Sequence, residues 1–281
     1  MKVNRRKFLK LTTAGLAGGL LSTVGGYLYS TRLEANLLTI ERVAIRLPHL
    51  PPALEGFRIV QLSDIHLHPF TQIEFVQAAV EQVNRMRPDL VALTGDYVLR
   101  RAESIFELAP VLGRLNARYG VVAILGNHDL WTSAAIVRQG LAGAGLPVLV
   151  NQGQTITVGR AVLYVAGVDD GWSGRPDLAA ALSARPAEAT TILLAHEPDL
   201  ADDFAADGRV DLQLSGHSHG GQVRFPGIGA PILPYLGQKY DMGLYRLGQM
   251  WLYTNRGLGV IGPPVRFNCP PEVTEFTLTG V

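Results

Sequence analysis

Aspartate, asparagine and histidine side chains gather at five points of this 281-residue chain, each directly after a short apolar run. These residue types offer oxygen and imidazole nitrogen, which divalent ions such as manganese, iron and zinc accept as ligands. The single cysteine, Cys269, excludes an internal disulfide framework and a cysteine-based zinc finger. The five clusters are Ser63-Asp64-Ile65-His66, Gly95-Asp96, Gly126-Asn127-His128-Asp129, His196, and Ser215-Gly216-His217-Ser218-His219.

The number of candidate ligands indicates two metal ions rather than one. An ion that keeps an open coordination position seldom takes more than four protein ligands. Two ions about 3.5–4 Å apart are the arrangement found in many phosphatases and nucleases. The candidates, with His128 left over, are Asp64, His66, Asp96, Asn127, His196, His217 and His219.

Strands must bring these clusters together. Apolar periodicity predicts helices from Ile73 to Val83 and from Ile105 to Leu115, with Pro88 stopping the first. Alternating strands and helices indicate an α/β domain, in which ligands bind at the carboxyl ends of strands. The polar clusters are therefore expected to converge. The predicted strands are Phe57–Leu62, Leu90–Thr94, Val121–Leu125, Ala161–Ala166, Ile192–Ala195 and Leu212–Leu214.

The C-terminal third has a different pattern, with short apolar runs between Gly and Pro turns and no clear helix. We expect antiparallel strands here, in a second sheet packed on the first. Residues 32–47 also end in strand-like alternation at Val43, Ile45 and Leu47. The C-terminal runs are Val223–Phe225, Gly243–Leu247, Met250–Thr254 and Val273–Leu278.

The order of the five clusters, over roughly residues 55–225, resembles the calcineurin-like metallophosphoesterase superfamily. The segments Asn255-Arg256-Gly257 and Cys269-Pro270-Pro271 are similar to a bacterial branch. That branch contains exported phosphodiesterases and relatives that cleave the pyrophosphate of a UDP-linked acylated sugar. The resemblance implies an α/β fold of two mixed β-sheets packed face to face and flanked by helices, a four-layer sandwich.

The resemblance also implies roles for the residues. A hydroxide activated by the two metal ions would attack phosphorus, and His128 would face the substrate and protonate the leaving oxygen. Asp129 would orient His128, and Leu99 stands where relatives often carry a further acid. One metal would be held by Asp64, His66 and His219, the second by Asn127, His196 and His217, and Asp96 would bridge the two.

The N-terminus has the pattern of an export signal. Residues 1–31 hold five basic residues and no acid, and residues 11–30 carry no charge. Arg5-Arg6 followed by Phe8-Leu9-Lys10 resembles a twin-arginine signal. We expect residues 1–31 to be this signal or a membrane anchor, and 32–281 to be the metallophosphoesterase domain. The expected partner is the twin-arginine export machinery, and the expected location is the outer face of the cytoplasmic membrane or the periplasm.

The expected activity is metal-dependent hydrolysis of a phosphodiester or pyrophosphate bond in a lipid- or nucleotide-linked substrate. The alternatives are a non-catalytic scaffold with this fold, and a protein phosphatase or nuclease of the same superfamily. Beyond residue 31 the chain has 20 basic and 24 acidic residues, which argues against nucleic acid as a partner. His68 is expected at the rim or surface. Arg224 and Arg256 fit a phosphate clamp or surface salt bridges equally well.

Overall fold

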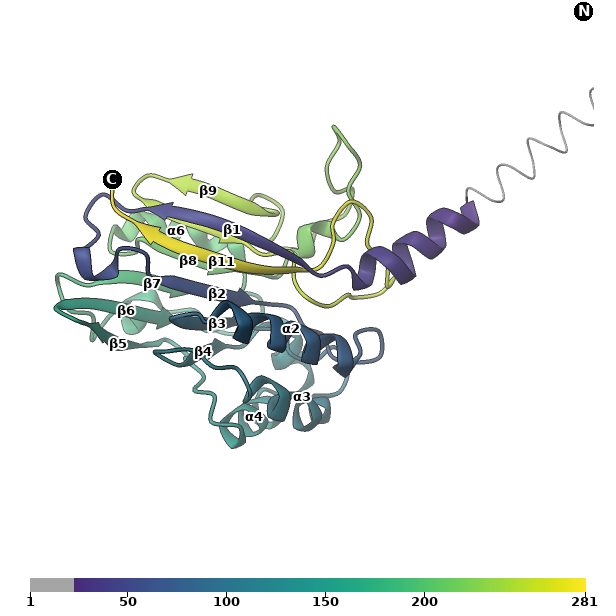
Figure 1. The fold of residues 1–281 in the computed structure, drawn as a ribbon, viewed down its shortest axis with the longest axis horizontal. Helices are drawn as coiled ribbons and strands as arrows, with labels where there is room; N and C mark the ends of the chain where they lie inside the picture. Colours follow the sequence, from purple (N-terminus) through teal and green to yellow (C-terminus); the bar gives the residue numbers. More distant parts are fainter. Residues whose placement is uncertain (1–22) are drawn as a thin grey trace, which may run out of the picture.

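The computed structural model describes residues 23–281, and these form two mixed β-sheets (Figure 1). The first sheet has five strands in the order β1-β11-β2-β3-β4. Strands β2, β3 and β4 run parallel, and β11 lies antiparallel to β2 and parallel to β1. The bounds are β1 Thr39–Arg46, β2 Arg58–Leu62, β3 Leu90–Thr94, β4 Val121–Ile124 and β11 Glu272–Thr279.

The second sheet has six strands in the order β5-β6-β7-β8-β10-β9. Its central strands β6, β7, β8 and β10 run parallel, whereas β5 and β9 pair antiparallel at the two edges. The bounds are β5 Gln152–Val158, β6 Ala161–Gly167, β7 Thr190–Leu194, β8 Leu212–Ser215, β9 Gly243–Leu247 and β10 Met250–Thr254.

The expectation of antiparallel C-terminal strands in one second sheet is partly wrong. Strands β9 and β10 do form an antiparallel pair, but β10 also pairs in parallel with β8. Strand β11 returns to the first sheet, where it lies between β1 and β2. Val223–Phe225 forms no strand and makes only isolated bridges, to Phe267 and Gly229.

Helices cover the outer face of each sheet. On the first sheet, α2 (Ile73–Met86) buries Val76, Val80 and Val83 and ends at the left-handed Arg87 before Pro88. Helices α3 (Ile105–Leu112) and α4 (Asn127–Gly143) pack into the same apolar cluster. Helices α5 (Leu178–Ala181) and α6 (Ala201–Asp207) contribute to a cluster on the second sheet.

Between the two sheets lies a third apolar cluster, formed by strand residues of both. It joins Ile59, Leu90 and Phe276 of the first sheet to Leu163 and Ile192 of the second. The chain is therefore a four-layer sandwich of helices, sheet, sheet and helices, and the predicted fold class is confirmed.

The described chain begins in a helical stretch that projects away from the sheets (Figure 1). This stretch leads into the π-helical turn Tyr29–Leu33. Within residues 23–281, no helix combines the length and apolarity needed to cross a bilayer. Arg5-Arg6 and most of the predicted signal lie outside the described residues, so the prediction of an export signal stays a prediction.

Candidate metal centre

The ends of parallel strands place the seven predicted ligands in one buried cluster. Asp64 and His66 follow β2, Asp96 follows β3, and Asn127 opens α4 just after β4. From the other sheet, His196 follows β7, whereas His217 and His219 follow β8. Each of the seven side chains is at most 5% exposed. Residues separated by as many as 155 positions in sequence, Asp64 and His219, therefore face one another across the junction of the two sheets.

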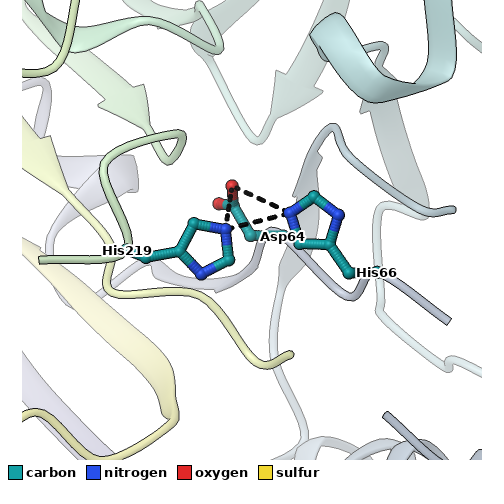
Figure 2. A group of neighbouring side chains, drawn as sticks. All are labelled: Asp64, His66 and His219. Carbon is teal, nitrogen blue, oxygen red and sulfur yellow. Dashed lines mark hydrogen bonds and ion pairs between the residues drawn. The ribbon is translucent and has the colours of Figure 1, made fainter. Parts of the chain in front are cut away.

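Asp64, His66 and His219 form the first half of this cluster, and Figure 2 shows the three side chains pointing toward one another. The Nε2 atoms of His66 and His219 lie 2.9 Å apart. Asp64 Oδ1 is 3.3 Å from His219 Nε2 and 3.9 Å from His66 Nε2. The three candidate ligand atoms therefore surround one small space that could hold a metal ion.

Asn127, His196 and His217 form the second half. Asn127 Oδ1 lies 2.9 Å from His217 Nδ1. The opposite nitrogen of that ring, Nε2, donates to the carbonyl of Tyr235 at 2.7 Å. His196 Nδ1 likewise meets the Thr94 carbonyl at 2.7 Å. Each ring therefore has one nitrogen fixed by a carbonyl and the other turned inward, as histidine ligands of metals commonly have.

Asp96 lies between the two halves. Its Oδ2 is 3.4 Å from His66 Nε2 and 3.2 Å from His196 Nε2, which belong to different predicted metal positions. Its Oδ1 accepts a hydrogen bond from the backbone N–H of His128 at 2.8 Å. A carboxylate in this position can share its charge between two cations.

Burial sets the protonation of the histidines. It lowers the pKa of His66 to about 3 and that of His217 to about 4, so both are neutral near pH 7. For His196, burial opposes the charged form, but the carboxylates of Asp96 and Asp64 outweigh burial and hold its pKa well above the ordinary value. The cluster therefore attracts positive charge, and a cation would take over the role of the His196 proton.

The donor set fits divalent cations. His196 Nε2 is buried and has no hydrogen-bond partner among residues 23–281, although it points at two carboxylates. The inward-facing Nε2 atoms of His66 and His219 are close enough for one ion to be held by both. Oxygen and imidazole ligands without thiolates suit manganese, iron or zinc.

The backbone at this centre is unusual. Five of the seven predicted ligands have φ between 48° and 69°, the left-handed region that side chains with a Cβ disfavour. Such conformations persist where the surrounding structure imposes them, and they cluster at functional sites. They turn each side chain inward immediately after its strand. The five residues are Asp64, His66, Asp96, His217 and His219.

Glycines let the loops approach the centre. A Cβ on Gly126 would collide with Asp96 Oδ1 and lie 2.7 Å from His196 Nε2. A Cβ on Gly257 would lie 2.7 Å from Asp64 Cβ. The segment after Asn255 also donates from the backbone N–H of Gly259 to the Asp64 carbonyl at 2.7 Å. The Gly257–Gly262 stretch therefore supports the Asp64 loop.

The predicted role of Asp129 is corrected by the structure. Both of its oxygens accept hydrogen bonds from backbone N–H groups, at 2.8 Å from Asp96, 2.9 Å from Tyr97 and 3.0 Å from Gly126. The His128 ring instead meets the Leu99 carbonyl at 3.3 Å through Nδ1. Asp129 therefore positions the Asp96 loop rather than the His128 ring.

Aromatic side chains lie beside the centre. Trp131 packs against His128 with ring centroids 4.7 Å apart, and Trp172 packs against His217 at 5.7 Å. The two tryptophans contact each other at 4.9 Å, and Tyr235 contacts Trp172. From the sequence, Trp172 fits either a residue over the site or an ordinary packed loop, whereas the sequence analysis missed Trp131.

Other candidates are accounted for by structural contacts. His68 lies at the surface and pairs with Glu107 at 2.9 Å. Arg224 is tied to Asp241 at 2.6 Å. Arg256 is held by Glu41 at 2.6 Å and by the buried Glu272 at 2.7 Å. Arg224 therefore joins two C-terminal segments, and Arg256 ties the segment after β10 to β1 and β11.

Comparison with known proteins places this geometry in a family. Residues 57–221, more than half of the chain, match the model of the calcineurin-like phosphoesterases. The chain is 37% identical to the uncharacterized metallophosphoesterase YkuE of Bacillus subtilis, over 99% of this chain and 98% of that protein. It is 32% identical to the phosphodiesterase YaeI of Escherichia coli, over 98% and 99% of the two chains.

Among solved structures, the sulfate thiohydrolase SoxB of Thermus thermophilus is similar with a TM-score of 0.49 and 15% identity, over 74% of this chain and 52% of that one. The matched family segment contains all seven predicted ligands and His128. The chain therefore belongs to the calcineurin-like phosphoesterase family.

Proposed function

We propose that this protein hydrolyses a phosphodiester or pyrophosphate bond with the help of two divalent metal ions. The observation that carries the proposal is the position of Asp96, whose Oδ2 lies within 3.4 Å of a histidine from each half of the cluster. The phosphodiesterase named among its relatives, 32% identical, supports the diester over a monoester.

Two metal ions bound at such a centre would act as Lewis acids on the phosphoryl oxygens and lower the pKa of an attacking water. The residues of the chain supply the rest. Asp64 and Asp96 provide buried negative charge, and the carbonyls of Thr94 and Tyr235 fix the rings of His196 and His217. His128 packs edge-on to His66 with centroids 4.7 Å apart, where its ring can donate a proton to the leaving oxygen.

The test is the Asp96→Asn variant of protein reconstituted with manganese or zinc, assayed with bis(p-nitrophenyl) phosphate. We expect turnover to fall by more than about a hundredfold, since even partners of metal ligands contribute 10- to 100-fold. Asp89→Asn is the control, because Asp89 accepts from the Arg58 N–H at the other end of the strands. Equal turnover by Asp96→Asn and the parent would contradict the proposal.

A substrate panel separates the alternatives within the superfamily. A diesterase or pyrophosphatase turns over bis(p-nitrophenyl) phosphate or a UDP-sugar faster than p-nitrophenyl phosphate or a phosphopeptide. The reverse order would indicate a protein phosphatase. A scaffold would show no turnover and bind no metal, but every predicted ligand is present and directed inward.

We also propose that residues 1–31 direct export of the folded domain 32–281 to the outer face of the cytoplasmic membrane or the periplasm. The pair Arg5-Arg6 before an uncharged stretch supports this proposal. Replacing both arginines by lysine in the full chain should leave the protein in the cytoplasmic fraction of a bacterium with twin-arginine machinery. Unchanged export of that variant would contradict it.

A further inference from the structure

An apolar cavity of about 250 Å³ lies beside the metal centre. Two of the seven predicted ligands, His217 and His219, form part of its wall, so a group bound at the centre would stand next to the cavity. Its other walls include Ile232, Leu233, Ile261 and Val265. None of the residues that line it is an acid, lysine or arginine.

Besides the two histidines, the polar side chains in the wall are Ser218 and Gln222, and both are already hydrogen-bonded. Ser218 donates to the Asp241 carbonyl at 2.5 Å. Gln222 accepts from the Ile261 N–H at 2.7 Å and donates to the Ile261 carbonyl at 3.4 Å. A ligand with polar edges, such as a nucleobase, would find few partners here, whereas an alkyl chain needs none. The cavity is therefore matched to an apolar ligand.

The loop that forms the outer wall exposes large apolar side chains. Ile228 is 80% exposed, Ile232 is 79% exposed and Phe225 is 45% exposed. Such a group of exposed apolar residues beside a cavity is typical of a surface that meets lipid or a partner. Exposed apolar side chains therefore border the cavity at the surface.

This surface is continuous with the start of the described chain. The backbone N–H of Arg266 donates to the Ser30 carbonyl at 2.9 Å, and Val265, beside Arg266, lines the cavity. The projecting helical stretch exposes Tyr27 and Leu28 and leaves the body at this end of the molecule (Figure 1). The sequence before it, residues 11–22, carries no charge. The exposed side chains of Tyr27 and Leu28 and the cavity thus lie at one end of the described chain, where a lipid surface could meet both.

We propose that the cavity binds the alkyl chain of the substrate, so that the substrate is an amphiphilic phosphoester whose phosphorus lies at the metal centre. This inference rests on the proposed function, since it places the substrate at the same centre. The tail lies among Leu233, Ile261 and Val265, and the phosphoester end lies at His217 and His219. Binding would remove apolar surface of both tail and cavity from water, and the affinity would rise with tail length.

The experiment uses full-length protein reconstituted with manganese or zinc and soluble p-nitrophenyl alkyl phosphodiesters, with methyl, butyl and octyl tails, below their micellar concentrations. Each buried methylene contributes up to about a fourfold gain in affinity. We expect kcat/KM to rise at least tenfold from methyl to octyl. Calorimetry with methylphosphonate and octylphosphonate, which lack a hydrolysable ester, should show a similar preference for the octyl compound.

Two variants locate the effect. Leu233→Ser makes the wall polar and Val265→Trp fills the cavity, and both should remove the chain-length preference while methyl diester turnover stays within about twofold. Leu50→Ser is the matched control and should keep the preference, because Leu50 is a half-buried leucine after β1 that packs against the apolar cluster between the sheets. Equal kcat/KM for all tails, or a preference that survives in both cavity variants, would overturn the proposal. If no diester is hydrolysed but octylphosphonate binds in a cavity-dependent way, the cavity assignment stands and the proposed function fails.

Discussion

The carboxylate of Asp129 accepts a hydrogen bond from the backbone N–H of Asp96 at 2.8 Å. In return, the carboxylate of Asp96 accepts from the backbone N–H of His128 at 2.8 Å. The loop after β3 and the first turn of α4 are thereby joined by two reciprocal bonds. The orientation of Asp96, the predicted bridge between two metals, therefore depends on a residue that touches neither predicted metal position.

Replacing Asp129 with Asn should disrupt this joint. In the variant, one carboxylate oxygen is replaced by an NH₂ group. This donor would face backbone N–H groups that in the parent have an acceptor, so they would lose their hydrogen bonds. We expect a loss of stability of about 1–3 kcal/mol, as for buried donors left unsatisfied. We also expect a fall in kcat and in metal content, measured by denaturant unfolding, steady-state kinetics and elemental analysis. A fall in stability with unchanged metal content and kcat would show that Asp129 supports the fold alone.

Replacing His128 with Gln should lower kcat by about 10²- to 10⁴-fold, since the ring is assigned the proton transfer to the leaving group. The metal content should stay at the parental value. His68→Gln is the control, because His68 lies at the surface and pairs with Glu107. Loss of metal from His128→Gln would instead indicate that His128 is a ligand. Its ring lies close enough to His66 and Asp96 to share an ion with them.

Gly126→Ala and Gly143→Ala form a matched pair. A Cβ at position 126 would meet Asp96 and His196, whereas one at 143, near the end of α4, meets nothing within 4 Å. The first variant should lose metal and activity. The second should be neutral or gain up to about 1 kcal/mol of stability, because alanine is the better helix former. Thermal unfolding and elemental analysis of both variants check this, and equal metal content in the two would contradict it.

Removal of metal should lower the melting temperature. Ions that bind only the folded state stabilise it by about 4 kcal/mol at a thousand times their dissociation constant. Because the ions would be held around Asp64 and Asp96, the protein should unfold at a lower temperature in a chelator than with manganese or zinc. In Asp96→Asn the difference should shrink. Identical unfolding curves of the parent in both conditions would revive the interpretation of a non-catalytic scaffold.

Much of the first sheet could be predicted from local pattern. Strand β3 has the predicted bounds, and α2 begins at the predicted Ile73. Helix α4 was missed because its apolar residues follow no clear helical period and Ser133 interrupts its backbone with φ −174°. The return of β11 to the first sheet was also missed, because the residues of a strand do not reveal which distant strand it pairs with.

The candidate metal cluster could be predicted because its chemistry lies in residue type and order. The groups that orient its side chains could not be predicted. The ring of His217 is fixed by the main-chain carbonyl of Tyr235, and a carbonyl leaves no trace in the residue type. Asp129 lies in the recognised Gly-Asn-His-Asp cluster, but its partners are backbone N–H groups that only the folded loops bring near it. The family resemblance implied His128 as the partner of Asp129, whereas in the structure its carboxylate accepts from the backbone N–H of Asp96.

The position of β11 has a consequence for biogenesis. β1, near the N-terminus, has β11 as its sole neighbour in the sheet, and β2, which leads into Asp64, has β11 on one side. A chain emerging from the ribosome therefore leaves both strands with an open edge until Glu272–Thr279 has been synthesised. A nascent chain that stops short of residue 272 keeps these edges unpaired.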